Sequence, residues 1–171
     1  MTSQRCFFAL SLTSPQQKSL DKWRRDVLGD RAGRPVPMAN FHLTLAFLGH
    51  LSPDQIRGLC ETAAALSWSP FTLTLDSFGQ WRRAGIAYLA PSTVPEPLRA
   101  LALQLREAGR DQGGFDETRD FKPHITLCRK AHGHLEPSRP PPPIRLAVDT
   151  FGLYASADGR YDRLASFPAQ A

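Results

Sequence analysis

The sequence has few cysteines and no long apolar run, and its first residues do not match the pattern expected of a secretory signal. Its 171 residues include Cys6, Cys60 and Cys128, an odd number without a C-x-x-C pair, so we expect no disulfide framework. The apolar runs are too short to cross a membrane, and the apolar start of the chain meets Ser14-Pro15 before a signal-peptide core is complete. We therefore expect a cytoplasmic protein that has no membrane segment.

The signatures of several enzyme classes are also missing. Neither the Walker A pattern of P-loop NTPases nor the Gly-x-Ser-x-Gly pattern of serine hydrolases occurs in the sequence. His124, His132 and His134 are close in sequence, but acidic residues around them are sparse, and zinc needs a complete shell of ligands. We therefore expect no metal site and no cofactor.

Lysine is scarce relative to arginine. Only Lys18, Lys22, Lys122 and Lys130 are lysines, so 17 of the 21 basic residues are Arg, and the formal net charge is +5. Most of this excess lies in residues 1–85, which carry +4, whereas residues 86–171 carry +1. Because the guanidinium group suits phosphate, phosphate or nucleic acid is a candidate ligand, although codon bias gives the same composition.

Length and periodicity predict one folded domain, residues 1–171, of the α+β class. Short apolar or alternating runs predict strands, and Ser-Pro pairs or helical spacing predict helices. The expected strands cover residues 6–12, 41–48, 71–75, 86–89, 121–127, 144–154 and 161–167, and the expected helices cover residues 14–28, 53–66 and 96–108. The proline-rich stretch Pro137–Pro143 predicts an exposed, extended connector.

One pattern occurs twice, as His42-Leu43-Thr44-Leu45 and as His124-Ile125-Thr126-Leu127. In a strand, side chains at i and i+2 share a face, so each copy places His and Thr on one side and two aliphatic anchors on the other. Two such half-sites can face each other across a pseudo-twofold axis. One imidazole can then accept a proton from an attacking group while the other protonates a leaving oxygen, and the two Thr hydroxyls donate to phosphate oxygens.

These motifs and their surroundings resemble the two-histidine (2H) phosphoesterase superfamily, and within it the bacterial and archaeal RNA 2′,3′-cyclic phosphodiesterases, also called 2′-5′ RNA ligases. The resemblance implies a bilobal α+β fold of two pseudo-symmetric lobes, with two mainly antiparallel sheets, outer helices and a central cleft lined by both motifs. It rests on Phe7-Phe8-Ala9-Leu10, Arg34-Pro35-Val36-Pro37, the blocks from His42 to Gly49 and from Phe121 to Arg129, Leu153-Tyr154 and Gly159-Arg160-Tyr161.

By this resemblance the substrate is RNA or a nucleotide that ends in a 2′,3′-cyclic phosphate, hydrolysed to a 2′-phosphate by a monomer. His124 activates water, His42 protonates the departing 3′ oxygen, and Thr44 and Thr126 hold the phosphate. In the reverse reaction a 5′-hydroxyl strand replaces water and forms a 2′-5′ linkage. The alternative is a non-catalytic protein that binds RNA 3′ ends and uses the same cleft as a phosphate clamp.

Two basic residues near the second motif are candidates for phosphate binding. Lys122 has the same strand parity as His124 and should share its face. Arg129 has the opposite parity and reaches the cleft only if the strand bulges or ends, although the resemblance places an Arg at this position. A surface ion pair is the alternative role for Arg129.

Aromatic residues next to the motifs are candidates for stacking on bases. They are Phe41, Phe121, Trp81 and Tyr88, although each of them alone fits a core position better. Cys128, which follows the second motif, is expected to be a small buried apolar residue rather than a nucleophile.

Overall fold

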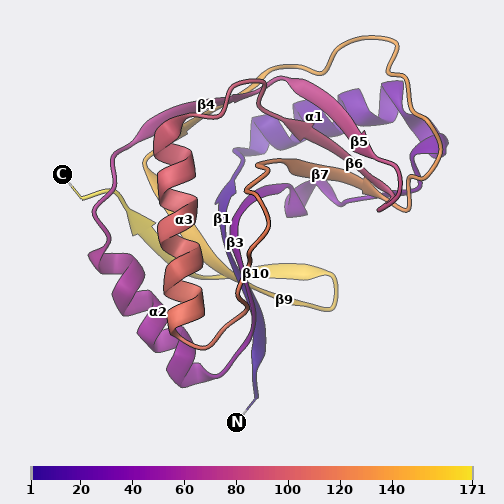
Figure 1. Ribbon diagram of the computed structural model, residues 1–171. Helices are drawn as coiled ribbons and strands as arrows, with labels where there is room; N and C mark the ends of the chain where they lie inside the picture. Colours follow the sequence, from indigo (N-terminus) through magenta and orange to yellow (C-terminus); the bar gives the residue numbers. More distant parts are fainter. Residues whose placement is uncertain (1, 171) are drawn as a thin grey trace.

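The computed structural model describes residues 2–170 and has an α+β fold, which confirms the predicted class (Figure 1). The helices in this part of the chain are α1 (Ser14–Val27), α2 (Pro53–Ala65) and α3 (Glu96–Asp111), with short 3-10 turns at Gly29–Ala32 and Met38–Asn40. The strands are β1 (Gln4–Ser11), β2 (Arg34–Pro35), β3 (His42–Leu51), β4 (Phe71–Leu75), β5 (Ser77–Trp81), β6 (Ile86–Ala90), β7 (Ile125–Arg129), β8 (Ile144–Val148), β9 (Thr150–Ala157) and β10 (Arg160–Pro168). No helix within residues 2–170 is long and apolar enough to span a membrane.

The first two helices begin at capping boxes. Thr13 and Gln16 exchange side-chain and backbone hydrogen bonds at the start of α1, and Ser52 and Gln55 do the same at the start of α2. The N-cap of α1 is therefore Thr13 and not the Ser that follows it, because the Gln three residues after Thr13 completes the box. Proline in the first turn of each helix fits the same local geometry.

Several boundaries differ from the sequence prediction. Residues 121–124 are not part of a strand, residues 77–81 form a strand that was not predicted, and residues 144–154 divide into β8 and the start of β9. Helix α3 continues to Asp111, beyond the predicted end at residue 108, and so includes Gly109. A Cβ atom at Gly109 would lie 2.5 Å from Leu48 Cδ2, so this glycine serves the close packing of α3 on β3.

Most strands belong to one antiparallel sheet, with the order β10-β9-β1-β3-β7-β6-β5 and with β2 paired to β7. Strands β4 and β8 form a second, two-stranded antiparallel sheet. The large sheet has two halves that meet between β3 and β7, where the only residue pair is Leu43 with Ile125 within the described chain. Because this pair lies inside both His-x-Thr motifs, the junction of the two halves brings the motifs side by side.

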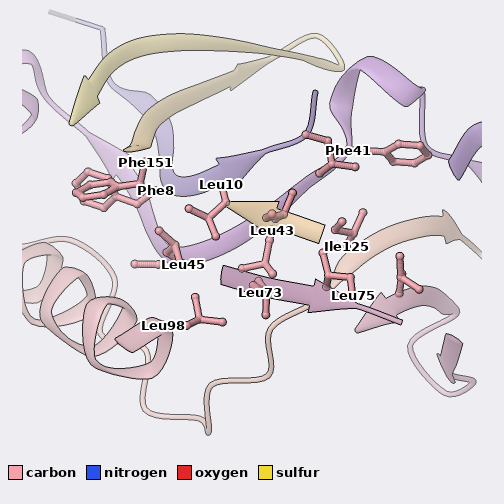
Figure 2. Close-up of a cluster of buried hydrophobic side chains, with 14 of the residues drawn as sticks. Phe8, Leu10, Phe41, Leu43, Leu45, Leu73, Leu75, Leu98, Ile125 and Phe151 are labelled. Atoms are coloured by element: carbon pink, nitrogen blue, oxygen red, sulfur yellow. The ribbon is translucent and has the colours of Figure 1, made fainter. Parts of the chain in front are cut away.

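The aliphatic residues of the motifs are buried, as predicted. Leu43, Leu45 and Ile125 are at most 1% exposed, and Figure 2 shows them in one apolar cluster with side chains from β1, β4 and α3. Figure 1 shows α2 and α3 side by side against one half of the sheet, whereas α1 lies behind the other half. The core therefore packs against the apolar face of both motif strands, and the His and Thr side chains lie on the opposite face.

A buried arginine ties α1 to the second motif and to the residue before the first. Arg24 is 5% exposed, and its Nη1 donates to the carbonyl oxygens of Val36 (2.5 Å) and Leu127 (2.7 Å). Its Nη2 pairs with Asp21 at 2.5 Å, and its guanidinium lies 4.8 Å from the ring centroid of Phe41. Phe41 is 2% exposed, so the prediction that it contacts substrate is wrong, because this ring is buried beneath the Arg24 guanidinium.

The proline-rich stretch Pro137–Pro143 has no helix or strand and is mostly exposed, as predicted for a connector. Two contacts hold it on α1. Trp23 Nε1 donates to the carbonyl oxygen of Arg139 at 3.1 Å, and the Arg139 guanidinium pairs with Asp26 at 3.1 Å. The connector therefore follows the outer surface of α1.

Candidate active site

The antiparallel register of β3 and β7 decides how the two motifs meet. With Leu43 opposite Ile125, His42 lies across from Thr126, and Thr44 lies across from His124. All four polar side chains are half-buried on the same face. His42 is the first residue of β3, but His124 immediately precedes β7, so the prediction that both motifs lie wholly inside strands is wrong for the second copy.

Each motif ends in a β-bulge. Leu45 is the extra residue of β3 opposite β1, and Leu127 is the extra residue of β7 opposite β6. Two consecutive buried residues mark each bulge, and the alternation of faces is reversed beyond it. The third residue after each Thr therefore returns to the polar face, and these residues are Phe47 in β3 and Arg129 in β7.

Arg129 thus lies on the same face as His124. Strict strand alternation would place it on the opposite face, and the bulge is the exception that we allowed for at this position. The positive charge of Arg129 lowers the pKa of both His42 and His124, so its guanidinium lies near both rings. Along β7, Arg129 lies beyond the Thr and so at the end of the site that holds His42. Its Cα partner on β2 is Arg34, so two exposed cations border that end.

The two imidazoles are oriented in the same way. Nδ1 of His42 is 2.8 Å from the carbonyl oxygen of Asn40, and Nδ1 of His124 is 2.7 Å from that of Lys122. Because a carbonyl oxygen only accepts, Nδ1 of the neutral ring carries the hydrogen and Nε2 keeps its lone pair. In His42 this lone pair accepts a hydrogen bond from the Thr44 hydroxyl at 2.9 Å.

Aromatic side chains surround both imidazoles. The ring of His124 meets an indole edge to face, and the ring of His42 meets a phenol ring in the same way. The contacting rings, with centroid distances from 4.7 to 5.8 Å, are Phe7 and Tyr161 at His42, and Trp81 and Tyr88 at His124. Trp81 and Tyr88 therefore lie against a candidate catalytic residue and are half-buried.

Burial keeps both rings neutral. It is the main cause that lowers the pKa of His42 from 6.5 to about 4; the hydrogen bond to Asn40 opposes this shift, and the charges of His124 and Arg129 add to it. Burial is also the main cause of the lowered pKa of His124, to which Arg129 contributes. Near pH 7 both rings therefore offer an unprotonated Nε2.

A cleft of about 800 Å³ opens beside Thr44 and His124. Its walls come from β3, from the hairpin of β5 and β6, from α3 and from residues 117–122. Two of the predicted substrate-binding residues line it, the exposed Lys122 and the half-buried Phe121.

Phe47 also lines this cleft, and the sequence did not indicate it. Strict alternation from Thr44 places Phe47 on the opposite face, toward the core. The bulge at Leu45 reverses that placement, and nothing in the sequence of β3 marks this bulge.

The remaining polar candidates do not join the paired motifs. Nδ1 of His132 is 3.0 Å from the carbonyl oxygen of Arg82, and Nε2 of His134 is 3.0 Å from Glu136 Oε1. Cys128 is 1% exposed, and burial raises the pKa of its thiol, in agreement with a small core residue. Across residues 2–170, no three His, Cys, Asp or Glu side chains gather as a metal site requires.

Comparisons with known proteins agree with this geometry. Residues 10–88 match the family model described as LigT like Phosphoesterase. The RNA 2′,3′-cyclic phosphodiesterase of Escherichia coli is 40% identical over 159 residues, which cover 92% of this chain and 89% of the relative. The protein of the same name from Geobacillus stearothermophilus is 30% identical over 95% of this chain and 56% of its own length.

Solved structures share the fold. The E. coli LigT structure complexed with 3′-AMP has a TM-score of 0.92 and 38% sequence identity, and the match covers 99% of both chains. A structure from Thermus thermophilus has a TM-score of 0.75 and 26% identity, with 96% of this chain and 97% of that chain covered. By sequence identity across most of its length and by its fold, this chain belongs to the LigT-like phosphoesterases of the 2H superfamily, as its motifs predicted.

Proposed function

We propose that this chain hydrolyses the 2′,3′-cyclic phosphate end of an RNA or nucleotide to a 2′-phosphate without a metal ion. Relatives are named for this activity, and E. coli LigT has been crystallised with 3′-AMP. The observation that carries the proposal is the register of Leu43 with Ile125, which sets each imidazole beside the hydroxyl of the other motif. Both motifs lie in one domain of one chain, so a monomer suffices. A cytoplasmic location fits the three free cysteines.

In the proposed reaction, Nε2 of His124 accepts a proton from water while the water oxygen bonds to phosphorus. The bond between phosphorus and O3′ breaks, and Nε2–H of His42 protonates O3′. O2′ stays on phosphorus, so the product is a 2′-phosphate. Thr44 and Thr126 donate to the non-bridging oxygens, and Arg129 balances their negative charge.

The acid role of His42 requires a proton that the free protein lacks. With a pKa of about 4, only about one ring in a thousand is protonated at pH 7. A bound phosphodiester places a negative charge beside the ring, and an opposite charge raises the pKa of an imidazole. Protonation of His42 also removes the lone pair that Thr44 donates to, which frees this hydroxyl for the phosphate. We therefore infer that the substrate itself brings His42 into its acid form.

The test is turnover of 2′,3′-cyclic AMP by the purified protein in EDTA, with separation of 2′-AMP from 3′-AMP. We expect 2′-AMP as the product, and we expect that His42→Ala and His124→Ala each remove turnover while circular dichroism shows a retained fold. His50→Ala is the matched control, because His50 is exposed on the same strand as His42 and should leave turnover intact. Binding without turnover in the parent would support the non-catalytic phosphate clamp instead.

A further inference from the structure

Strands β9 and β10 form a hairpin at one edge of the large sheet (Figure 1). Ala157 and Arg160 are Cα partners, so only two residues make the turn. They are Asp158, with a φ of +53°, and Gly159, with a φ of +75°. Two left-handed residues in such a loop fit a type I′ turn, for which Asp-Gly is a preferred pair. The local sequence therefore sets where the hairpin turns.

This turn is joined to the residues just before the first motif. Nδ2 of Asn40 donates a hydrogen bond to the carbonyl oxygen of Gly159 at 2.9 Å. The backbone of Asn40 is also held, because its N–H donates to the carbonyl oxygen of Pro37 at 2.8 Å. The carbonyl oxygen of the same residue accepts from Nδ1 of His42 at 2.8 Å. Asn40 thus links the imidazole to a turn that is 119 residues away in the sequence.

The hairpin also supplies one of the rings around this imidazole. The ring centroid of Tyr161 lies 5.0 Å from that of His42, and the two rings are nearly perpendicular, at 89°. Phe7 packs on both rings, with centroid distances of 4.9 Å to His42 and 5.1 Å to Tyr161. Phe7 is buried and Tyr161 is half-buried, so the three rings form one packed cluster. The hairpin therefore contacts His42 directly through Tyr161 and indirectly through Asn40.

Charged and titratable groups around His42 come from the second motif and from the hairpin. They are His124 and Arg129 beside the second motif, Tyr161 against the ring, and Asp158 and Arg160, which are exposed at the turn. From β1 the contact is Phe7, which carries no charge. Burial is nevertheless the largest cause that lowers the pKa of His42, ahead of these charges. The rings that cover the imidazole therefore influence its protonation.

We propose that the β9–β10 hairpin positions the imidazole of His42, with Asn40 and Tyr161 as positioning residues that act through this ring; the inference rests on the acid role proposed above. Asn40 fixes the acceptor that keeps a hydrogen on Nδ1, which leaves Nε2 to carry the proton for O3′. Tyr161 covers one side of the ring and limits its contact with water. A ring held in this way presents Nε2 to O3′ in one orientation, whereas a freely rotating ring does so only part of the time.

The first measurement follows the ring itself, without substrate. NMR of the imidazole nitrogens and protons gives the pKa of His42 and the nitrogen that carries its hydrogen. We expect Tyr161→Ala to raise this pKa by about one pH unit, because water reaches the ring, and Tyr161→Phe to keep the parent value. Asn40→Ala should move hydrogen from Nδ1 toward Nε2, because the acceptor is no longer fixed. The controls, which should match the parent, are Leu164→Ala on the strand of Tyr161 and Met38→Ala in the turn of Asn40, at residues 39% and 36% exposed.

Turnover of 2′,3′-cyclic AMP is the second readout. Asn40→Ala should lower kcat about tenfold and change KM by less than about twofold, since the substrate still binds while the acid is misaligned. If Asn40→Ala and Tyr161→Ala lower turnover but keep the parent pKa and tautomer of His42, the hairpin has a structural role only and the inference is refuted.

The two readouts also separate this inference from the proposed function. If the parent forms no 2′-AMP, the hydrolase proposal fails, while the NMR measurement still decides whether the hairpin positions the ring. Tyr161→Leu, which keeps apolar volume but covers less of the imidazole, replaces Tyr161→Ala should the latter not fold, and the pKa of His42 should shift in the same direction.

Discussion

The buried imidazole of His42 makes a prediction about stability that does not depend on catalysis. Its pKa is about 4 in the folded protein, against 6.5 in the unfolded chain, mainly because of burial. Between these two values the unfolded chain binds more protons than the folded protein, so the stability rises with pH across this window and is lost as the pH falls. We therefore expect His42→Gln to lose stability less steeply than the parent when the pH is lowered.

The magnitude follows from the two pKa values. At pH 7 the folded imidazole is neutral and the unfolded one is only about a quarter protonated, so this residue contributes little to the pH dependence there. At pH 5 the unfolded imidazole is almost fully protonated while the folded one is still mostly neutral. Between the unfolded pKa of 6.5 and pH 5, each pH unit lowers the free energy of unfolding of the parent by about 1.4 kcal/mol. The parent should therefore lose about 2 kcal/mol more than His42→Gln between pH 7 and pH 5.

The assay is urea unfolding of both proteins at pH 7, 6 and 5, compared as the change in the free energy of unfolding for each protein. All other titrating groups are common to the two chains, so the difference between their pH profiles isolates His42. Parallel profiles would show that the imidazole titrates freely in the folded protein. The account of a neutral, buried His42 would then be wrong, and with it the need for substrate to protonate this ring.

Three further substitutions test residues that hold the active-site strands in place or set the charge around the imidazoles. Arg24→Met should lower the free energy of unfolding by about 1–3 kcal/mol, because it removes the Arg24 donor from the Val36 carbonyl oxygen, one of two donors from the Leu127 carbonyl oxygen and one of two Arg partners from Asp21; a thermal or urea melt measures this loss. Gly33→Ala should raise KM severalfold with a smaller effect on kcat, since its φ is +72° and a Cβ would lie 2.4 Å from the Arg129 carbonyl oxygen; an unchanged KM contradicts this. Arg129→Gln should raise the pKa of both His42 and His124 in the free protein, because the Arg charge lowers both; an NMR titration of the imidazole protons decides.

The sequence predicted the catalytic face because it depends on local periodicity. Alternation within His-x-Thr-x places Leu43 and Ile125 in the core and the polar residues opposite, and the structure has this arrangement. The helix starts were also predictable to within a residue, since a Ser or Thr, a Pro and a following Gln make a complete N-terminal signal. The pairing of the motifs could be inferred only from their duplication and from the family resemblance.

The sequence could not predict what depends on bulges and on contacts between distant segments. Alternation alone misplaces Phe47 and Arg129, because the bulge at the last residue of each motif is visible only in the strand pairing. Phe41 shows the complementary error. Its neighbour His42 faces the site, but Phe41 is buried in the core with its ring against the Arg24 guanidinium of α1, a contact that the sequence around Phe41 does not show. Tertiary packing, rather than local preference, decides these positions.

The two copies of the motif are alike in sequence but not in surroundings. Both imidazoles donate from Nδ1 to a backbone carbonyl, and a bulge follows each Thr. The residue that the bulge returns to the active face is nevertheless Phe47 in one copy and Arg129 in the other, so a ring is added on the cleft side and a cation on the His42 side. We expect a donor RNA, whose phosphates lie on one side of its cyclic end, to bind with those phosphates toward Arg129 and Arg34. In the proposed reaction this direction, and not any intrinsic difference between two similar imidazoles, makes one of them the acid and the other the base.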